Sequence, residues 1–123
     1  MARLRDRGYA LGVVTSKSRE FAQRGLRLCA LWEFMDVFVS MDDSSRHKPH
    51  PEPLLLALER LQVAPEHAVY VGDSRHDMQA ARAAGIATVA ALWGPVPRRE
   101  LELENPDVLA CRPEELLEIF QVS

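Results

Sequence analysis

Short apolar runs alternate with segments of helical period along most of the chain. The runs at residues 9–14, 34–39, 68–71 and 86–92 are apolar without strict alternation, which is typical of strands buried on both faces of a parallel sheet. Segments with the helical period lie between them, at residues 19–31, at 54–61 and in the stretch that ends at Gly85. The pattern therefore predicts alternating strands and helices.

The two ends of the sequence extend this pattern. Residues 98–103 predict a short helix, 107–110 a small strand and 113–120 a final helix. Residues 2–7 look like the last turns of a helix that stops at Gly8. Strands that alternate with helices predict an α/β fold with a parallel sheet and right-handed crossovers. At 123 residues, we expect a single domain over positions 1–123.

Composition narrows the possible partners and the compartment. The net charge is −3 and the basic residues are interspersed with acidic ones, so neither nucleic acid nor an anionic membrane is expected as a partner. No apolar run approaches the length that spans a bilayer, and no signal segment is evident. Cys29 and Cys111 lack metal-ligand spacing and are expected to be buried free thiols, so we expect a cytoplasmic protein.

Polar side chains follow several of the predicted strands. Thr15 and Ser16 end the first strand, Lys48 lies in a proline-rich loop after the second, and Asp73 and Asp77 follow the third. Because parallel strands end on one side of the sheet, these groups should converge. A hydroxyl, an ammonium group and two carboxylates suit a phosphate and the Mg²⁺ that bridges its oxygens. Trp93 is expected to pack at the same rim.

Each of these residues also has a purely structural interpretation. Asp77 stands three residues after Ser74, a spacing close to a helix-capping arrangement, and an acid in the first turn suits the helix dipole. Thr15 and Ser16 could simply end a strand and begin a helix, and lysines such as Lys48 are usually surface residues. For Asp77, the capping role and the site role are compatible.

Three stretches resemble motifs of a known family. Residues 13–17 (Val-Val-Thr-Ser-Lys), 47–53 (His-Lys-Pro-His-Pro-Glu-Pro) and 71–77 (Val-Gly-Asp-Ser-Arg-His-Asp) resemble motifs II, III and IV of the haloacid dehalogenase-like hydrolases. The phosphoglycolate phosphatase-like branch is the most similar. The resemblance implies a Rossmann-like, three-layer α/β/α core.

The resemblance also implies a role for each site residue. Thr15, with Ser16 beside it, would bind the transferred phosphoryl group, and Lys48 would steady the phosphate and the nucleophile. Asp73 would ligate Mg²⁺, and Asp77 would complete the acidic site directly or through water. The implied activity is Mg²⁺-dependent hydrolysis of small phosphorylated metabolites.

The sequence departs from the family in its first motif. An Asp-x-Asp, which in the family supplies the nucleophile and the acid/base, is absent from the 123 residues, and no cap domain is evident. The family's first-motif strand lies between the strands of motifs II and IV. Without that strand, these two must pair with each other, be bridged by another chain, or leave apolar edges that invite dimerisation or strand exchange.

Three hypotheses for function follow from the sequence. The chain is part of a Mg²⁺-dependent phosphatase that works through an aspartyl-phosphate and is inactive by itself. Alternatively, it is a non-catalytic module that at most binds Mg²⁺ or phosphate, or that works as an oligomeric or partner-binding piece. A third possibility is a complementing fragment that recovers the missing motif from a separate polypeptide.

Overall fold

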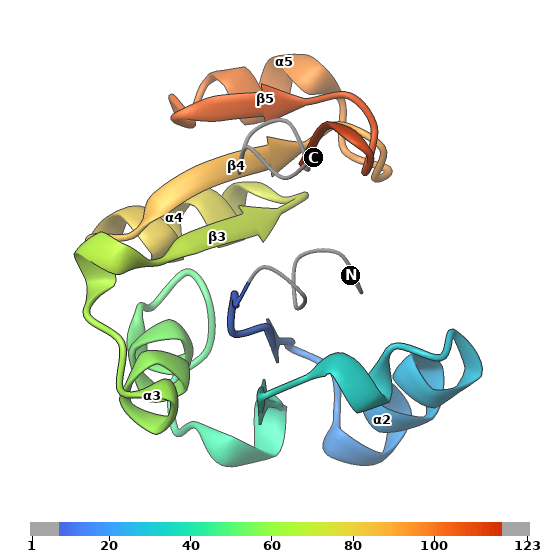
Figure 1. The fold of residues 1–123 in the computed structure, drawn as a ribbon. Coiled ribbons are helices and arrows are strands. Elements are labelled where there is room, and N and C mark those ends of the chain that lie inside the picture. Colours follow the sequence, from blue (N-terminus) through green and yellow to red (C-terminus); the bar gives the residue numbers. More distant parts are fainter. Residues whose placement is uncertain (1–7, 117–123) are drawn as a thin grey trace.

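The computed structural model describes residues 8–116, in which short parallel strands alternate with helices (Figure 1). The strands are β1 (Gly12–Val14), β2 (Val37–Val39), β3 (Val69–Gly72), β4 (Ala87–Ala91) and β5 (Val108–Ala110). The helices are α2 (Arg19–Leu28), α3 (Glu52–Leu61), α4 (Arg75–Ala84) and α5 (Arg98–Glu102), with 3₁₀ turns η1 (Trp32–Phe34), η2 (Met41–Asp43) and η3 (Pro65–His67). The α/β fold predicted from the sequence is confirmed. The helix predicted at 2–7, and the second half of the one predicted at 113–120, lie outside the described residues.

Local sequence signals fix the ends of α4. The Ser74 hydroxyl accepts a hydrogen bond from the Asp77 amide, and the Asp77 carboxylate accepts one from the Ser74 amide, which forms a capping box. The helix ends at Gly85, which has φ +76°, a conformation that glycine adopts without steric cost. The capping box thus places the start of α4 at Ser74 and Asp77, in the predicted candidate site.

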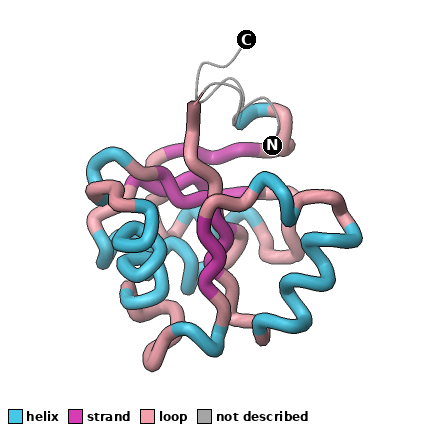
Figure 2. The backbone as a smooth tube through the Cα atoms, turned by 60° about the horizontal axis from the view of Figure 1, so that its bottom comes forward, coloured by secondary structure: helices cyan, strands magenta, loops and turns pink. Residues whose placement is uncertain are grey.

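The strands form two separate parallel sheets (Figure 2). One contains β1 and β2, with Val13 opposite Phe38, and the other has the order β3-β4-β5, with Val71 opposite Val89. Within the described residues, β1 and β3 do not pair with each other. Of the three arrangements that the sequence left open, direct pairing of these two strands is therefore wrong for this chain.

The first two strands are shorter than the apolar runs predicted. The expected strands at 9–14 and 34–39 reduce to Gly12–Val14 and Val37–Val39, because each strand extends only as far as the ladder with its single neighbour. Trp32–Phe34 forms a 3₁₀ turn instead, and the Trp32 ring meets the Phe38 ring edge-on at 5.2 Å. Apolar residues before β2 thus pack against the strand without pairing with it.

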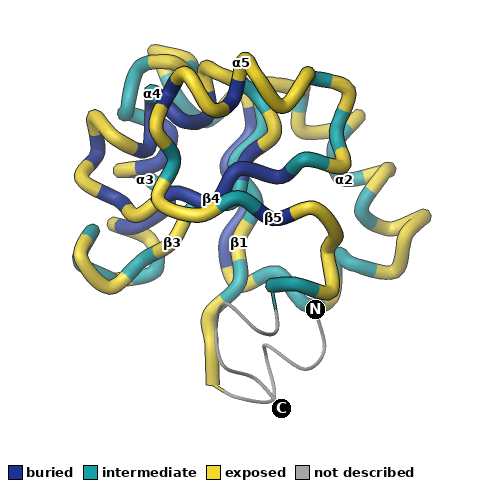
Figure 3. The backbone as a smooth tube through the Cα atoms, turned by 90° about the horizontal axis from the view of Figure 1, so that it is seen from above, coloured by how far each residue is buried: buried dark blue, intermediate teal, exposed yellow. Residues whose placement is uncertain are grey.

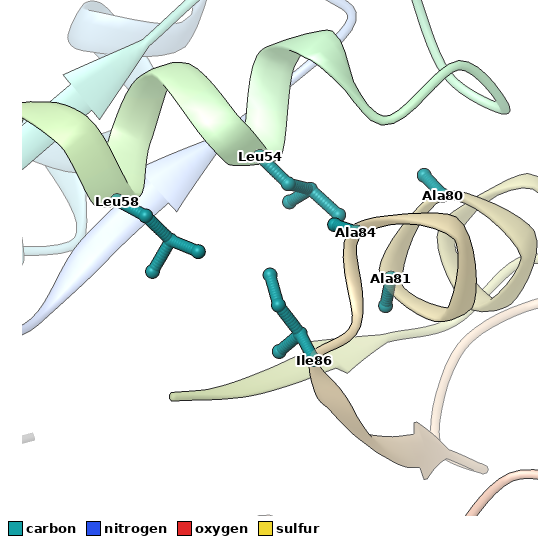
Figure 4. Close-up of a cluster of buried hydrophobic side chains, with 6 residues drawn as sticks. All are labelled: Leu54, Leu58, Ala80, Ala81, Ala84 and Ile86. Carbon is teal, nitrogen blue, oxygen red and sulfur yellow. The ribbon is translucent and has the colours of Figure 1, made fainter. Parts of the chain in front are cut away.

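The main core lies between α3, α4 and β3 (Figure 3). The side chains that form it are Leu54 and Leu58 of α3, Ala80, Ala81 and Ala84 of α4, and Ile86 (Figure 4). A second cluster joins β2 to α3 through Val37, Val39 and Ala57. Val14 packs against both clusters, so α3 connects the two sheets from one side.

The opposite side of β1 and β2 is much less covered. Helix α2 has no buried residue, and the Phe21 and Leu28 side chains are 63% and 81% exposed. Cys29 follows α2 directly, and Cys111 follows β5 in a turn; both are exposed free thiols. The prediction of buried cysteines is therefore wrong, because apolar neighbours in sequence bury a side chain only where another element covers them. Among the described residues, no helix is long and apolar enough to cross a membrane.

Candidate active site

The Lys48 ammonium group lies at the centre of the candidate site. Its Nζ donates hydrogen bonds to Asp77 Oδ1 at 2.6 Å, to the Tyr70 hydroxyl at 3.1 Å and to the Val14 carbonyl oxygen at 3.3 Å. The Lys48 and Asp77 side chains are 11% and 9% exposed. Since an ammonium group has three donors, Lys48 is fully satisfied by three different elements.

The loop that carries Lys48 is fixed to the start of α3. The Ser45 amide and hydroxyl each donate to Glu52 Oε1 at 2.9 Å, and the Ser44 hydroxyl lies 2.9 Å from the same oxygen. These hydrogen bonds from Ser45 and Ser44 hold the pKa of Glu52 below its usual value. These hydrogen bonds hold the loop in one conformation and so fix the position of Lys48. A fixed position argues against the interpretation of Lys48 as an ordinary surface lysine.

Asp77 uses both carboxylate oxygens within the protein. Oδ1 accepts from Lys48 and lies 3.2 Å from the Tyr70 hydroxyl, while Oδ2 accepts from the amides of Asp73 and Ser74, both at 3.2 Å. Burial alone would raise the pKa of Asp77. The positive charge of Lys48 and the hydrogen bonds from Lys48, Ser74 and Asp73 outweigh burial, so the pKa lies below its usual value. Asp77 thus caps α4 and also lies in the candidate site.

Asp73 is arranged differently. It lies on the exposed turn between β3 and α4, and its carboxylate makes no hydrogen bond to the described residues. Gly94 leaves it room, because a Cβ at that position would lie 2.7 Å from Asp73 Oδ2. Of the two acids, Asp73 is the one whose oxygens are free to bind an incoming group.

These side chains surround a cavity of about 310 Å³ at the carboxyl ends of β1 and β3. Its polar lining comes from Thr15, Lys48, Tyr70, Asp73 and Asp77, and Trp93 also lines it. Thr15 Oγ1 also accepts a hydrogen bond from the Lys17 amide at 3.1 Å. Ser16 is exposed and is not part of the lining. Four of the five residues selected from the sequence therefore meet in one cavity.

Sequence reasoning missed Tyr70. Its hydroxyl lies within hydrogen-bond distance of Lys48, of Asp77 and of the Val14 carbonyl, so it connects β3 to β1. Burial, together with the negative charges of Asp77 and Asp73, raises the pKa of Tyr70 far above its usual value and keeps the hydroxyl protonated. The available signal was a phenol in an otherwise apolar strand, since a buried Tyr hydroxyl usually has a partner.

The oxygen atoms present fit part of a Mg²⁺ site. Mg²⁺ in proteins is held by one or two carboxylates and completed by water and phosphate oxygens. Asp73 offers a free carboxylate, whereas both Asp77 oxygens are already taken by protein donors. In the part of the chain that the structure describes, no group of three or more acidic, His or Cys side chains could hold a metal. Any Mg²⁺ here would therefore need further oxygen ligands.

Comparison with known proteins identifies the family. Residues 1–91 match the sequence profile of the family described as "Haloacid dehalogenase-like hydrolase". The chain belongs to the haloacid dehalogenase-like hydrolases. The resemblance carried by residues 13–17, 47–53 and 71–77 is thereby confirmed, and so is the α/β core that it implied.

Similar proteins are about twice as long as this chain. It is 44% identical to a pyrophosphatase PpaX from Bacillus cereus over 117 residues, 95% of this chain and 54% of that protein. A phosphatase from Thermococcus onnurineus superposes with a TM-score of 0.85 at 33% identity, covering 99% of this chain and 55% of the other. For a structure described as a predicted phosphoglycolate phosphatase from Haemophilus somnus, the values are 0.90, 28%, 98% and 53%. The chain therefore spans about half the length of its relatives.

Proposed function

We propose that this chain carries the phosphate- and cation-binding part of a Mg²⁺-dependent phosphatase for small phosphorylated metabolites. The observation that carries the proposal is the Lys48–Asp77 pair, 2.6 Å apart in a cavity that also contains Thr15 and the free carboxylate of Asp73. Family membership and relatives described as phosphatases and pyrophosphatases support it.

The proposed roles follow from the contacts of each residue. Lys48 places a positive charge beside the cavity, where it stabilises phosphoryl oxygens. Thr15 donates its hydroxyl to the same oxygens. Ser16 lies beside Thr15 but outside the cavity lining, so no contact with the phosphate is assigned to it. Asp73 ligates Mg²⁺, whose chemistry is to neutralise charge on the phosphate. Asp77 fixes Lys48 and reaches the cation only through water, because both its oxygens already accept hydrogen bonds.

The proposal assigns no nucleophile to this chain. The 123 residues contain no Asp-x-Asp, so negligible phosphatase turnover is expected from the chain by itself. A complete hydrolase would attack phosphorus with a carboxylate and split the reaction into two steps. The same absence favours a second candidate function, a non-catalytic module that binds only Mg²⁺ or phosphate.

Binding and turnover experiments test the proposal and the second candidate function. The chain is titrated with inorganic phosphate with and without Mg²⁺, and amide chemical shifts are followed by NMR. The proposal expects shifts at Thr15 and Asp73 that depend on Mg²⁺ and are lost in Asp73→Asn, with Glu66→Gln as an exposed acidic control. Absence of any shift contradicts both functions. Hydrolysis of p-nitrophenyl phosphate by the isolated chain, if Asp73→Asn abolished it, would contradict the proposal that this chain carries no nucleophile.

A further inference from the structure

We infer that Trp93 forms a binding surface for the leaving group, and that the preferred ligand is a small phosphate monoester whose leaving group contains a planar aromatic ring. The inference rests on the proposed function, because it adds a second contact beside the proposed phosphate position. Three observations carry it: the exposed ring of Trp93, the fixed loop that holds this residue, and the size of the cavity.

The Trp93 side chain is not used for packing within the described residues. Trp93 is 43% exposed although it lines the cavity, and its ring makes no hydrogen bond, ring contact or cation contact with those residues. Leu92 and Val96, before and after it in sequence, instead pack on the buried cluster around Met78. Because tryptophan offers one of the largest apolar contact areas of any side chain, a ring left open at a cavity is available to a ligand.

The second tryptophan of the chain is used differently. The Trp32 ring meets the Phe38 ring edge-on, with 5.2 Å between their centroids, and the Arg27 guanidinium lies over the Trp32 ring at 5.6 Å. Trp32 does not line the cavity. Contacts with neighbouring side chains therefore account for Trp32, whereas they do not account for Trp93.

The loop that carries Trp93 is held on both sides of this residue. The Leu92 amide donates a hydrogen bond to the Ala110 carbonyl at 2.8 Å, which ties the start of the loop to β5. Gly94 lies against Asp73, since a Cβ at Gly94 would lie 2.8 Å from Asp73 Cβ. Trp93 is therefore fixed next to the free carboxylate that the proposed function assigns to Mg²⁺.

The cavity and the indole ring together define the class of leaving group. A volume of about 310 Å³ lies at the lower end of the range for ligand pockets, which suits a phosphate and a single ring. Aromatic rings in offset or edge-to-face contact gain energy beyond the area that they bury, so an aromatic ring should bind better than a saturated ring of the same size. The phosphate would bind at Lys48 and Thr15, and the ring would contact Trp93.

The test titrates the full chain, in the presence of Mg²⁺, with inorganic phosphate, phenyl phosphate and cyclohexyl phosphate. Because negligible turnover is expected from this chain, binding can be measured at equilibrium by calorimetry. Phenyl phosphate should bind about fivefold more tightly than either of the other two probes. It should also shift the NMR signal of the Trp93 indole N–H and leave that of Trp32 in place.

Substitutions of the two tryptophans separate a ligand contact from a structural role. Trp93→Leu should lower the ratio of the phenyl phosphate affinity to the inorganic phosphate affinity about fivefold. Trp93→Phe should retain most of this ratio, because it keeps an aromatic ring, and Trp32→Phe is the matched control that should not change it. If Trp93→Leu lowered both affinities equally, the ratio would stay the same, and the inference would be overturned.

Two results distinguish a failure of this inference from a failure of the proposed function. The inference alone is overturned if inorganic phosphate binds with Mg²⁺ and phenyl phosphate binds no more tightly, or if cyclohexyl phosphate binds as tightly as phenyl phosphate. If none of the three probes binds, the proposed function is wrong and the inference is overturned with it.

Discussion

The Lys48 ammonium group and the Asp77 carboxylate form a buried pair with 2.6 Å between Nζ and Oδ1, which joins the loop before α3 to the first turn of α4. The same ammonium group reaches the Val14 carbonyl of β1. The pair therefore connects the two sheets as well as lining the candidate active site. Substitutions here should affect stability and ligand binding together.

The first prediction concerns the loss of one partner. Lys48→Met leaves the Asp77 carboxylate buried with less compensation, so the free energy of unfolding should fall by about 3 kcal/mol. The matched control is Arg98→Met, which breaks the exposed Arg98–Glu102 pair and should cost about 0.5 kcal/mol or less. Urea unfolding measures both. Equal effects of the two substitutions would show that the Lys48–Asp77 pair behaves as a surface pair.

The second prediction is a pH dependence. Because the folded-state pKa of Asp77 is below its usual value, its contribution to stability is present above the unfolded pKa of about 3.9 and is lost as the pH falls through the folded value. Asp43, Glu52 and Glu104 share the downward direction. The free energy of unfolding should therefore decline below about pH 4.

The Asp77→Asn variant measures how much Asp77 contributes to this pH dependence of stability. The variant should be less stable than the wild type at pH 7 and should lose less stability between pH 5 and pH 2, since one shifted carboxyl has been removed. Urea unfolding at each pH gives both curves. If the free energy of unfolding changed with pH in parallel for the two proteins, folding would not shift the pKa of Asp77.

The third prediction separates Asp73 from Asp77. The Asp73 carboxylate has no hydrogen bond to the described residues, so Asp73→Asn should change the free energy of unfolding by no more than about 0.5 kcal/mol. Binding of Mg²⁺, followed by isothermal titration with inorganic phosphate present, should be lost. Gly94→Ala tests the space around the same carboxylate, because its Cβ would lie 2.7 Å from Asp73 Oδ2. It should weaken Mg²⁺ binding and leave the fold intact.

Convergence at the site could be predicted because it depends on topology alone. Parallel strands end on one side, so Thr15, Lys48, Asp73 and Asp77 could be brought together without knowledge of any side-chain conformation. The sequence could not predict that Asp77 is hydrogen-bonded within the protein while the Asp73 carboxylate is free. This difference depends on which oxygens face the amides of residues 73 and 74 and which face Lys48, and those directions are fixed only by tertiary packing.

The errors in the fold prediction have a related cause. Apolar runs predicted where the strands lie, but the length of a strand depends on how many neighbouring strands form a ladder with it. Strands β1 and β2 are therefore only three residues long each. The exposure of Cys29 depends on what covers α2, and in the described residues nothing buries that helix. Tyr70 was overlooked because a strand pattern identifies a buried position without showing what its hydroxyl contacts.

The last prediction concerns the close approach of β3 to α4. A Cβ at Gly72 would clash with Asp77 Cβ and would lie 2.8 Å from its Cγ. Gly72→Ala should therefore push Asp77 away from Lys48 and disturb the capping box at Ser74, at a cost of about 1–3 kcal/mol. Gly25→Ala is the matched control, because nothing lies within 4 Å of its added Cβ in the interior of α2.

The control should have the opposite sign. Alanine in an unhindered helix interior is favoured over glycine by about 0.5–1 kcal/mol, so Gly25→Ala should raise the urea midpoint and Gly72→Ala should lower it. NMR of the Asp77 carboxyl carbon then distinguishes a displaced side chain from general loosening. Displacement from Lys48 predicts a higher Asp77 pKa in Gly72→Ala and an unchanged one in Gly25→Ala. An unchanged Asp77 pKa in both variants would mean that the clash is relieved elsewhere, by movement of β3 rather than of the buried pair.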